Sequence, residues 1–186
     1  MKNRLTFFAE FIENLFYPDK VVIAGGILVI LLFINSNLAF NNTVTFFLSL
    51  LVFFITSNSI KKIVKNADKS FLLSAIASTI IFLLLVRLLQ VSKELEFGAI
   101  SIFFNLVILF IVRSFWKISA HTSVYTNFST TLSLIYSNFI LTFIFLPIIV
   151  WSRIRLKRHT YSQVIIGGAV GSILPIIIHN LLFISI

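Results

Sequence analysis

The chain has no cysteine, only three prolines and only six acidic residues among its 186 positions. Without cysteine, disulfides, thiolate metal sites and cysteine nucleophiles are excluded. Charged residues of both signs make up 11% of the sequence and hydrophobic residues 59%, and the mean hydropathy is +1.06. Because about a quarter of the residues in a soluble domain are charged, this composition indicates an integral membrane protein.

Positive charge is in clear excess, since 15 Lys and Arg against six Asp and Glu give a formal net charge of +9. In a soluble protein this excess would suggest nucleic acid as a partner. Here the cations lie between apolar runs, so membrane topology, anionic headgroups and phosphates explain them better. We therefore expect the bilayer and a lipid phosphate as partners, and no nucleic acid.

The long apolar runs predict membrane-spanning helices. Each approaches the ~20 residues that a helix needs to cross the hydrocarbon core, and they cover 21–40, 43–60, 71–90, 98–115 and 164–184. The last run contains Gly167, Gly168 and Gly171, which form a small-residue face suited to close helix contact. We predict an all-α, polytopic bundle of about six to seven transmembrane helices, with residues 1–186 forming a single domain.

The stretch 122–151 decides the topology. Hydroxyl and amide side chains crowd residues 122–137, so this helix should lie inside the bundle, with its hydroxyls bonded to neighbours or to its own backbone. Read as one helix, 122–151 would put His121 and His159 on opposite membrane faces. We instead predict a two-helix hairpin that turns at Ser137-Asn138, with 139–151 returning as a short apolar helix.

Residues 1–20 predict an interfacial helix rather than a cleaved signal peptide, because no small-residue cleavage site follows the first apolar run. Apolar side chains fall on one face at helical spacing and charged ones on the other. The apolar face holds Leu5, Phe8, Ile12, Leu15 and Phe16, and the opposite face holds Arg4, Glu10 and Glu13. The helix should end at Tyr17-Pro18. A disordered tail is the alternative.

The hairpin puts the amino terminus, the 61–70 loop and both ends of 122–151 on one membrane face. That face holds 13 of the 15 Lys and Arg, and only Arg87 and Lys93 lie on the other. The positive-inside rule makes the cation-rich face cytoplasmic. We therefore predict a multi-pass cell-membrane protein with this face in the cytoplasm.

Two polar clusters stand at the ends of apolar runs on the predicted cytoplasmic face. The first holds Lys117, Ser119 and His121, and the second holds Ser152, Arg153, Arg158, His159 and Gln163. Together they offer two imidazoles, fixed cations and a hydroxyl without a carboxylate cluster. This set argues against a divalent-metal site and for metal-free phosphoryl transfer.

Each residue of the clusters suits one step of that chemistry. On a helix, the Gln163 carbonyl would accept from the His159 imidazole and leave its other nitrogen free to attack. His121 would donate a proton from a helix start. Lys117 and Arg153 would hold phosphate oxygens.

The amides beside Ser119 and Ala120, at the start of a helix, would add donors for an anion. The simpler interpretation is that the basic residues only anchor the spans and touch headgroups. Trp116 and Trp151 are then interface anchors, and His179, in the distal half of the last span, has a packing role.

The two polar clusters and the residues around them resemble the motifs of a known family. The segment "WSRIRLKRHTYSQVIIGGAVG" closely resembles the third signature of the type 2 phosphatidic acid phosphatase and haloperoxidase-like superfamily: SR, five residues, His, three residues and usually Asp. Ser152, Arg153 and His159 fit by type and spacing, whereas Gln163 stands where the family has Asp. "KISAH" resembles the second signature, commonly PSGH. The resemblance covers residues 113–171 and implies an acid phosphatase/vanadium haloperoxidase-like core within 113–186.

The resemblance also implies roles for individual residues. His159 would be the nucleophile that forms a phosphohistidine, and His121 would protonate the leaving group and later help to activate water. Arg153 and Lys117 would hold phosphate oxygens. Gln163 can orient the imidazole but cannot stabilise its cation by charge, so we expect a slower enzyme.

The first signature of the family, a Lys six residues before Arg-Pro, is not intact. "KNADKS" is the only remnant, with Lys65 and Lys69 supplying charge and Lys62 as an alternative register. Many membrane members of the family present their site outside the cytoplasm, whereas the charge bias here places it inside.

We expect a metal-independent lipid phosphate phosphatase, without cofactor, acting on phosphatidate or a polyprenyl (di)phosphate. The alternative is a catalytically weak or inactive lipid-phosphate-binding protein of the same fold. A small transporter is a third reading, which the absence of an inverted repeat disfavours. The sequence leaves the lipid and the oligomeric state open.

Overall fold

A computed structural model describes residues 4–18, 20, 21, 23, 24, 27, 39–65 and 67–184. This part of the chain is helical and contains no strand. The elements are α1 (Arg4–Leu15), α3 (Ala39–Ile63), α4 (Ala67–Leu89), α5 (Lys93–Arg113), α6 (Ala120–Ile135), the 3₁₀ helix η1 (Ser137–Phe145), α7 (Leu146–Arg155), α8 (Tyr161–His179) and the π-helical turn η2 (Asn180–Ile184). The all-α prediction is therefore confirmed.

Three helices are long and apolar enough to cross a membrane, at Lys69–Leu89, Lys93–Arg113 and Tyr161–Phe183. A shorter apolar helix covers Thr43–Phe53 within α3. The predicted span 21–40 falls mostly outside the described residues. The arms of the 122–151 segment are shorter than a span, because α6 has 16 residues, η1 nine and α7 ten. The number of six to seven spans stays a prediction.

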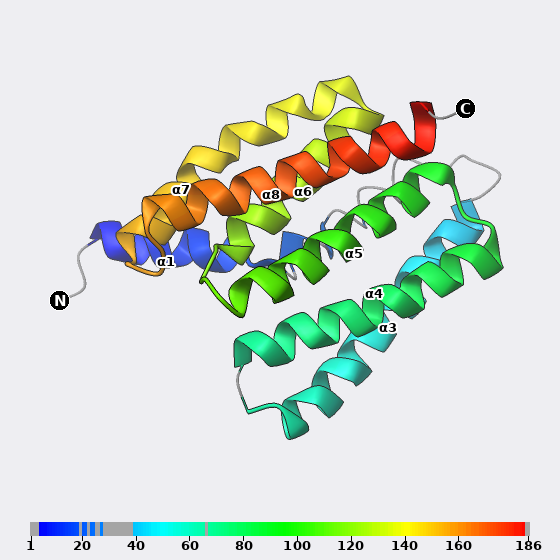
Figure 1. Ribbon diagram of the computed structural model, residues 1–186, viewed down its shortest axis with the longest axis horizontal. Coiled ribbons are helices and arrows are strands. Elements are labelled where there is room, and N and C mark those ends of the chain that lie inside the picture. Colours follow the sequence, from blue (N-terminus) through cyan, green and yellow to red (C-terminus); the bar gives the residue numbers. More distant parts are fainter. Residues whose placement is uncertain are drawn as a thin grey trace.

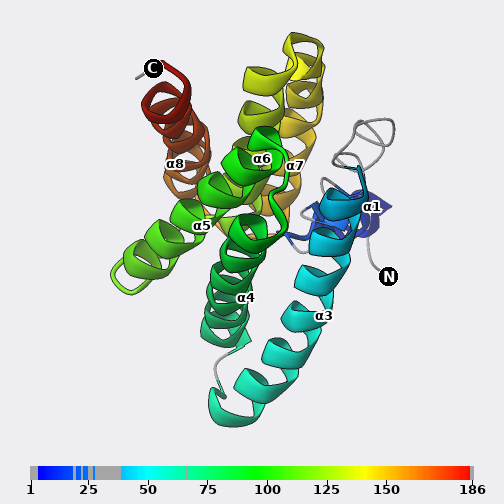
Figure 2. The same ribbon diagram turned by 90° about the vertical axis from the view of Figure 1, so that its right-hand side faces the viewer.

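Helix α6 lies between its neighbours, and α7 and α8 run alongside it (Figure 1). In the view turned by 90°, α3 and α4 form a pair that extends away from the α6–α8 group (Figure 2). Helix α5 connects the two groups, because it packs against α4, α6 and α8. The centre of the molecule is thus the polar helix, as predicted.

Most hydroxyl and amide side chains of α6 are buried, and several are hydrogen-bonded to α5, whereas Ser129 Oγ and Thr130 Oγ1 have no partner within the described residues. Ser123 donates to Asn105 Oδ1 at 2.8 Å, and the Asn127 amide donates to Ser101 Oγ at 2.9 Å. Thr131 donates to the same Ser101 hydroxyl at 3.2 Å. Both of these partners belong to α5, so the polar face of α6 is satisfied by a neighbouring helix rather than exposed.

The predicted hairpin is confirmed. Helix α6 ends at Ile135, its C-cap Tyr136 has an extended backbone (φ −136°, ψ 106°), and the chain returns through η1 and α7. The Tyr125 hydroxyl donates to the Thr142 carbonyl of η1, a contact that joins the two arms. The turn includes the Ser137-Asn138 pair, which opens η1.

Glycines let α8 approach α6 closely, as predicted. A Cβ added at Gly167 would lie 2.7 Å from the Ser119 carbonyl oxygen, and one at Gly171 would overlap the Ser123 carbonyl. Thr126 of α6 donates to the Gly168 carbonyl at 3.0 Å. The two backbones therefore touch, and only glycine fits at the contact.

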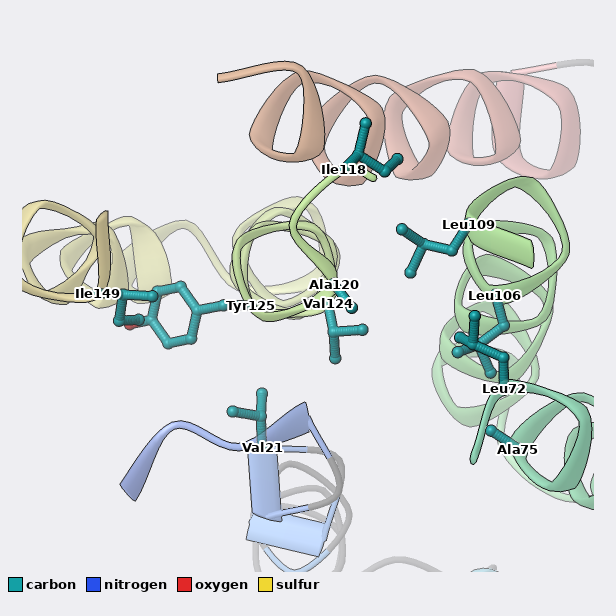
Figure 3. Close-up of a cluster of buried hydrophobic side chains, with 10 residues drawn as sticks. All are labelled: Val21, Leu72, Ala75, Leu106, Leu109, Ile118, Ala120, Val124, Tyr125 and Ile149. Carbon is teal, nitrogen blue, oxygen red and sulfur yellow. The ribbon is translucent and has the colours of Figure 1, made fainter. Parts of the chain in front are cut away.

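The apolar core surrounds the start of α6. Ile118, Ala120, Val124 and Tyr125 are buried against Leu106 and Leu109 of α5, Leu72 and Ala75 of α4, Ile149 of α7 and Val21 (Figure 3). This cluster holds the amino-terminal end of α6 against four other segments. Packing in this cluster therefore fixes the position of the start of α6.

Helix α1 packs on α7 with one side and leaves its other side exposed. Ala9 and Ile12 are buried, and the Phe16 ring meets the Tyr125 ring at 5.4 Å. Leu5, Phe7, Phe8, Phe11 and Leu15 are exposed. The prediction of a helix is confirmed, but the prediction for Glu13 is wrong. Glu13 shares the protein-facing side with Ala9, Ile12 and Phe16, one helical turn apart, and it points inward instead of to water.

We expect Gly171→Ala to lower the free energy of unfolding by about 1–3 kcal/mol, because the methyl group forces two packed backbones apart. Thermal unfolding in detergent measures this change. Gly98→Ala is the matched control, since the nearest atom to its added Cβ is Thr131 Cγ2 at 3.9 Å. Equal midpoints for both variants would contradict the close contact.

Candidate functional site

The two polar clusters meet at one end of the molecule. Figure 1 shows the end of α7, the start of α8, the link between α5 and α6, and α1 gathered there. The Ser119 amide donates to the Gln163 carbonyl at 3.1 Å, so the two clusters are joined by a backbone hydrogen bond. His121, Arg153 and His159 are close enough for charge on one to shift the pKa of another.

A Schellman motif brings Arg153 and His159 together. Lys157 has a left-handed φ of 54°, its amide donates to the Ile154 carbonyl at 2.9 Å, and the Arg158 amide donates to the Arg153 carbonyl at 3.0 Å. This 5→2 and 6→1 pair closes the end of α7. The chain therefore reverses within six residues and returns His159 to the arginine.

Ser119 positions His121 by capping α6. The Ser119 hydroxyl, which is fully buried, accepts from the Thr122 amide at 3.4 Å and from the Thr122 hydroxyl at 3.0 Å. Because the Ser119 amide already donates to the Gln163 carbonyl, it is not free for an anion. The predicted contact between Ser119 and a phosphate stays a prediction, but its role as a cap is established.

Gln163 also serves as a cap. Its Oε1 accepts from the Thr160 amide at 3.1 Å, and its own amide donates to the Thr160 hydroxyl at 3.4 Å. This capping box begins α8. The Gln163 side chain also interacts with the His159 imidazole and raises its pKa, as expected for an acceptor beside the ring.

Three buried nitrogen atoms in the cluster have no hydrogen-bond partner in the described part of the chain: His121 Nε2, His159 Nδ1 and Arg153 Nε. They come from α6, the α7–α8 link and α7. Buried polar atoms are nearly always paired in folded proteins. Three unpaired nitrogens on three converging elements therefore indicate a place for a polar ligand.

Both imidazoles are held in the neutral form. Burial, followed by the charges of Arg153, His159 and Arg113, lowers the pKa of His121 to about 3. Burial also lowers the pKa of His159 to about 4, with Arg153 acting in the same direction. A neutral imidazole has a free lone pair, so His159 is available as a nucleophile at neutral pH.

Glu13 of α1 is an acidic side chain that pairs with the cluster, and the sequence did not predict this pairing. Its Oε1 accepts from Arg153 Nη1 and lies 3.3 Å from Arg158 Nε. The Arg153 side chain is 6% exposed and that of Glu13 18%. The signal in the sequence was the spacing of Glu13 from Ala9, Ile12 and Phe16, which puts all four on one face.

Other residues of the site were also missed. The Tyr17 ring stacks edge-on against the His121 ring at 5.0 Å and against Phe71 of α4 at 6.2 Å. Arg113, predicted only as a topology cation, acts on the His121 pKa. Tyr17 was not recognisable from the sequence, because it reaches the cluster from a distant segment, whereas Arg113 lies only eight residues before His121.

The predicted lysines have different positions. Lys117 is exposed, and its carbonyl raises the pKa of His159 by accepting from the ring. Lys65 and Lys69 are exposed residues at the α3–α4 link and the first turn of α4. In Figure 1 this link lies at the lower edge of the molecule, apart from the end of α7 and the start of α8, and a contact of either lysine with phosphate stays a prediction.

His179 lies far from the cluster, about 24 Å along α8 from Gln163 at 1.5 Å per residue. Its ring stacks on Phe183 at 4.9 Å and meets Phe97 at 5.6 Å. The predicted packing role is therefore confirmed. Within the described residues, no group of three His, Asp or Glu side chains is arranged to hold a metal ion.

Comparison with models of known protein families, with curated proteins and with solved structures gives no match. The part of the chain that the structure describes is helical and contains three helices long and apolar enough to cross a membrane. It also carries a cluster formed by the buried His121 and Arg153 and the half-buried His159.

We expect Lys157→Gly to raise the free energy of unfolding by about 0.5–1 kcal/mol. A side chain in the left-handed region costs about 1–2 kcal/mol, and the greater freedom of glycine in the unfolded chain offsets about 0.4–1 kcal/mol of the gain. Arg155→Gly is the control, because it removes the same charge from a helical position and should be destabilising. Thermal unfolding of both variants measures this difference. A lower stability for Lys157→Gly than for Arg155→Gly would contradict the motif.

We expect stability to fall as the pH drops below about 6.5. The pKa values of His121 and His159 are lowered in the folded protein to about 3 and about 4, so the unfolded chain binds protons more readily between these values and 6.5. Unfolding midpoints measured from pH 8 to pH 4 should show this loss. His121→Asn should reduce the slope, and a slope unchanged in that variant would contradict the assignment.

Proposed function

We propose that the protein is a membrane-embedded, metal-independent phosphatase that hydrolyses a phosphomonoester or diphosphate of a lipid. The observation that carries the proposal is the set of three buried, unpaired nitrogens from His121, His159 and Arg153. A phosphate group offers the acceptors and the negative charge that these groups lack. The resemblance of both motifs to the type 2 phosphatidic acid phosphatase superfamily points to the same reaction.

In the proposed reaction each side chain of the cluster has one task. The neutral His159 imidazole attacks phosphorus, and the bond between phosphorus and the alcohol oxygen breaks. His121 gives its proton to the departing alcohol. Water then attacks the phosphohistidine and releases phosphate, while the proton that water loses returns to His121. The arginine and Lys117 hold the phosphate oxygens and stabilise the charge of the transition state.

The low pKa of His121 fits this sequence only when substrate is bound. At a pKa of about 3, His121 carries no proton at neutral pH. A phosphate dianion beside the ring would raise this pKa, because opposite charge favours the protonated form. The substrate would then create the acid that its own leaving group needs.

The lipid would enter from the bilayer. Leu5, Phe7, Phe8 and Phe11 of α1 are exposed, as is Trp151 at the end of α7, and aromatic side chains favour the membrane–water boundary. The headgroup would then meet the cluster while the tail stays in hydrocarbon. We further propose the multi-pass arrangement with this end in the cytoplasm, which the cation count supports.

A second candidate is a lipid-phosphate-binding protein without turnover. Gln163 favours it, since an amide that also caps α8 cannot supply the charge that stabilises an imidazolium. The pairing of Arg153 with Glu13 favours it too. The two neutral histidines favour the enzyme.

The test is release of phosphate from phosphatidate and from a polyprenyl phosphate by the full chain in detergent, with a chelator present. Wild type should release phosphate, and His159→Ala should reduce the rate at least 10⁴-fold, as loss of a nucleophile does. His179→Ala is the matched control, because that imidazole lies at the far end of α8. Equal rates for His159→Ala and wild type would refute the phosphatase. Saturable lipid-phosphate binding without turnover would instead support the second candidate.

A further inference from the structure

We infer that Glu13 is a built-in occupant of the phosphate site and that α1 is a latch, so a lipid phosphate binds only when Glu13 leaves Arg153. The inference rests on the proposed phosphate site and adds its regulation. A single carboxylate from the amino-terminal helix holds the arginine that the phosphate needs.

The contacts of Glu13 resemble those expected of a phosphate oxygen. Its Oε1 accepts from Arg153 Nη1 and lies 3.3 Å from Arg158 Nε, so one oxygen meets two guanidinium groups. Arg153 is 5% exposed and would be strongly penalised without a counter-charge. Glu13 therefore keeps the arginine ionised and buried while the site holds no phosphate.

The same helix also covers the histidines. The Glu13 backbone carbonyl is near enough to His121 to act on its ring, and the Tyr17 ring lies edge-on against that imidazole at 5.0 Å. One turn of chain thus covers the arginine and the proton donor together. If Glu13 served only to orient Arg153, the same segment would not also need to cover His121.

Besides the ion pair of Glu13, apolar and aromatic contacts hold α1 to the protein. Ala9 and Ile12 are the buried apolar residues of α1, and aromatic contacts such as Phe8 with Trp151 at 5.9 Å join it to α7. Its other face is exposed and aromatic, with Phe7 68% exposed. A bilayer would bind that face, so hydrocarbon would offset part of the apolar contact that α1 loses when it moves off the cluster.

The difference in charge between a phosphate monoester and the Glu13 carboxylate favours replacement of Glu13 by phosphate at Arg153. A phosphate monoester carries up to two negative charges and three oxygens, whereas Glu13 carries one charge and two oxygens. The phosphate can therefore pair with Arg153 and, once its charge has raised the pKa of His121, accept from that imidazole while its phosphorus faces the His159 lone pair, which the carboxylate does not do. Lipid phosphates should displace the latch, and neutral lipids should not.

Glu13→Gln is the first test, because it keeps the size of the side chain and removes its charge. The variant should bind inorganic phosphate roughly tenfold more tightly, measured by thermal stabilisation, since a charge-assisted contact no longer competes. The KM for phosphatidate should fall by a similar factor. Glu10→Gln is the matched control, with the same change on the same helix, and should leave both values within about twofold. A weaker affinity for phosphate in Glu13→Gln would overturn the latch and make Glu13 a positioning residue.

Cross-linking provides a second test that does not depend on removing Glu13. The chain has no cysteine, so Phe8→Cys and Trp151→Cys introduce the only two thiols. Joining them with a short, cleavable bifunctional thiol reagent should hold α1 on α7, abolish phosphate binding and hydrolysis, and permit recovery of both on cleavage. In each single-cysteine variant, the same treatment should leave the rate of hydrolysis at the value that this variant had before treatment. Full activity in the cross-linked protein would overturn the inference.

The outcomes separate this inference from the proposed function. If His159→Ala stops hydrolysis while Glu13→Gln leaves phosphate affinity unchanged, the phosphatase stands and the latch is wrong. If no variant hydrolyses lipid phosphate but Glu13→Gln binds inorganic phosphate more tightly, the latch stands on a binding protein.

Discussion

The burial of a hydroxyl-lined helix is the constraint on which the rest of the structure depends. Helix α6 carries a row of Ser, Thr and Asn side chains that lipid cannot solvate, so other helices must surround it. Asn105 and Ser101 of α5 supply partners on one side. On another side the glycines of α8 bring its backbone into contact with α6. The chain between α6 and α8 has to turn back to allow both contacts, and this turn delivers Arg153 and His159 to the start of α6.

The electrostatics of the cluster follow from that arrangement. Two imidazoles and a guanidinium converge in a buried place, and burial together with the arginine charge keeps both rings neutral by lowering their pKa values to about 3 and about 4. Such a site has excess positive charge and unpaired nitrogens, so it calls for an anion. Glu13 supplies part of this charge, and a phosphate would supply more. Binding, proton donation and release of α1 would then respond to the same ligand charge.

Particular residues show how far sequence reasoning reaches. The hairpin was predictable, because the crowd of hydroxyls in 122–137 and the apolar run after it cannot form one lipid-facing rod. The close contact of α8 was predictable from Gly167 and Gly171. The capping role of Gln163 was not foreseen, although Thr160 three residues before it is a recognisable capping-box partner. The use of the Ser119 amide by the Gln163 carbonyl could not be foreseen, because that bond joins two segments whose spacing depends on the whole turn.

The sequence by itself determined that this is a helical, hydrophobic protein with a polar helix at its centre. It also determined that two histidines and an arginine lie at the ends of its apolar runs. These conclusions rest on composition, periodicity and local spacing, which act within one or two helical turns. Only the tertiary structure decided that Glu13 faces Arg153 and Tyr17 faces His121. The amphipathic pattern of α1 permits two orientations, one towards water and one towards the protein. The choice between them depends on a buried guanidinium 140 residues away, because an unpaired charge there would be far less stable than a paired one.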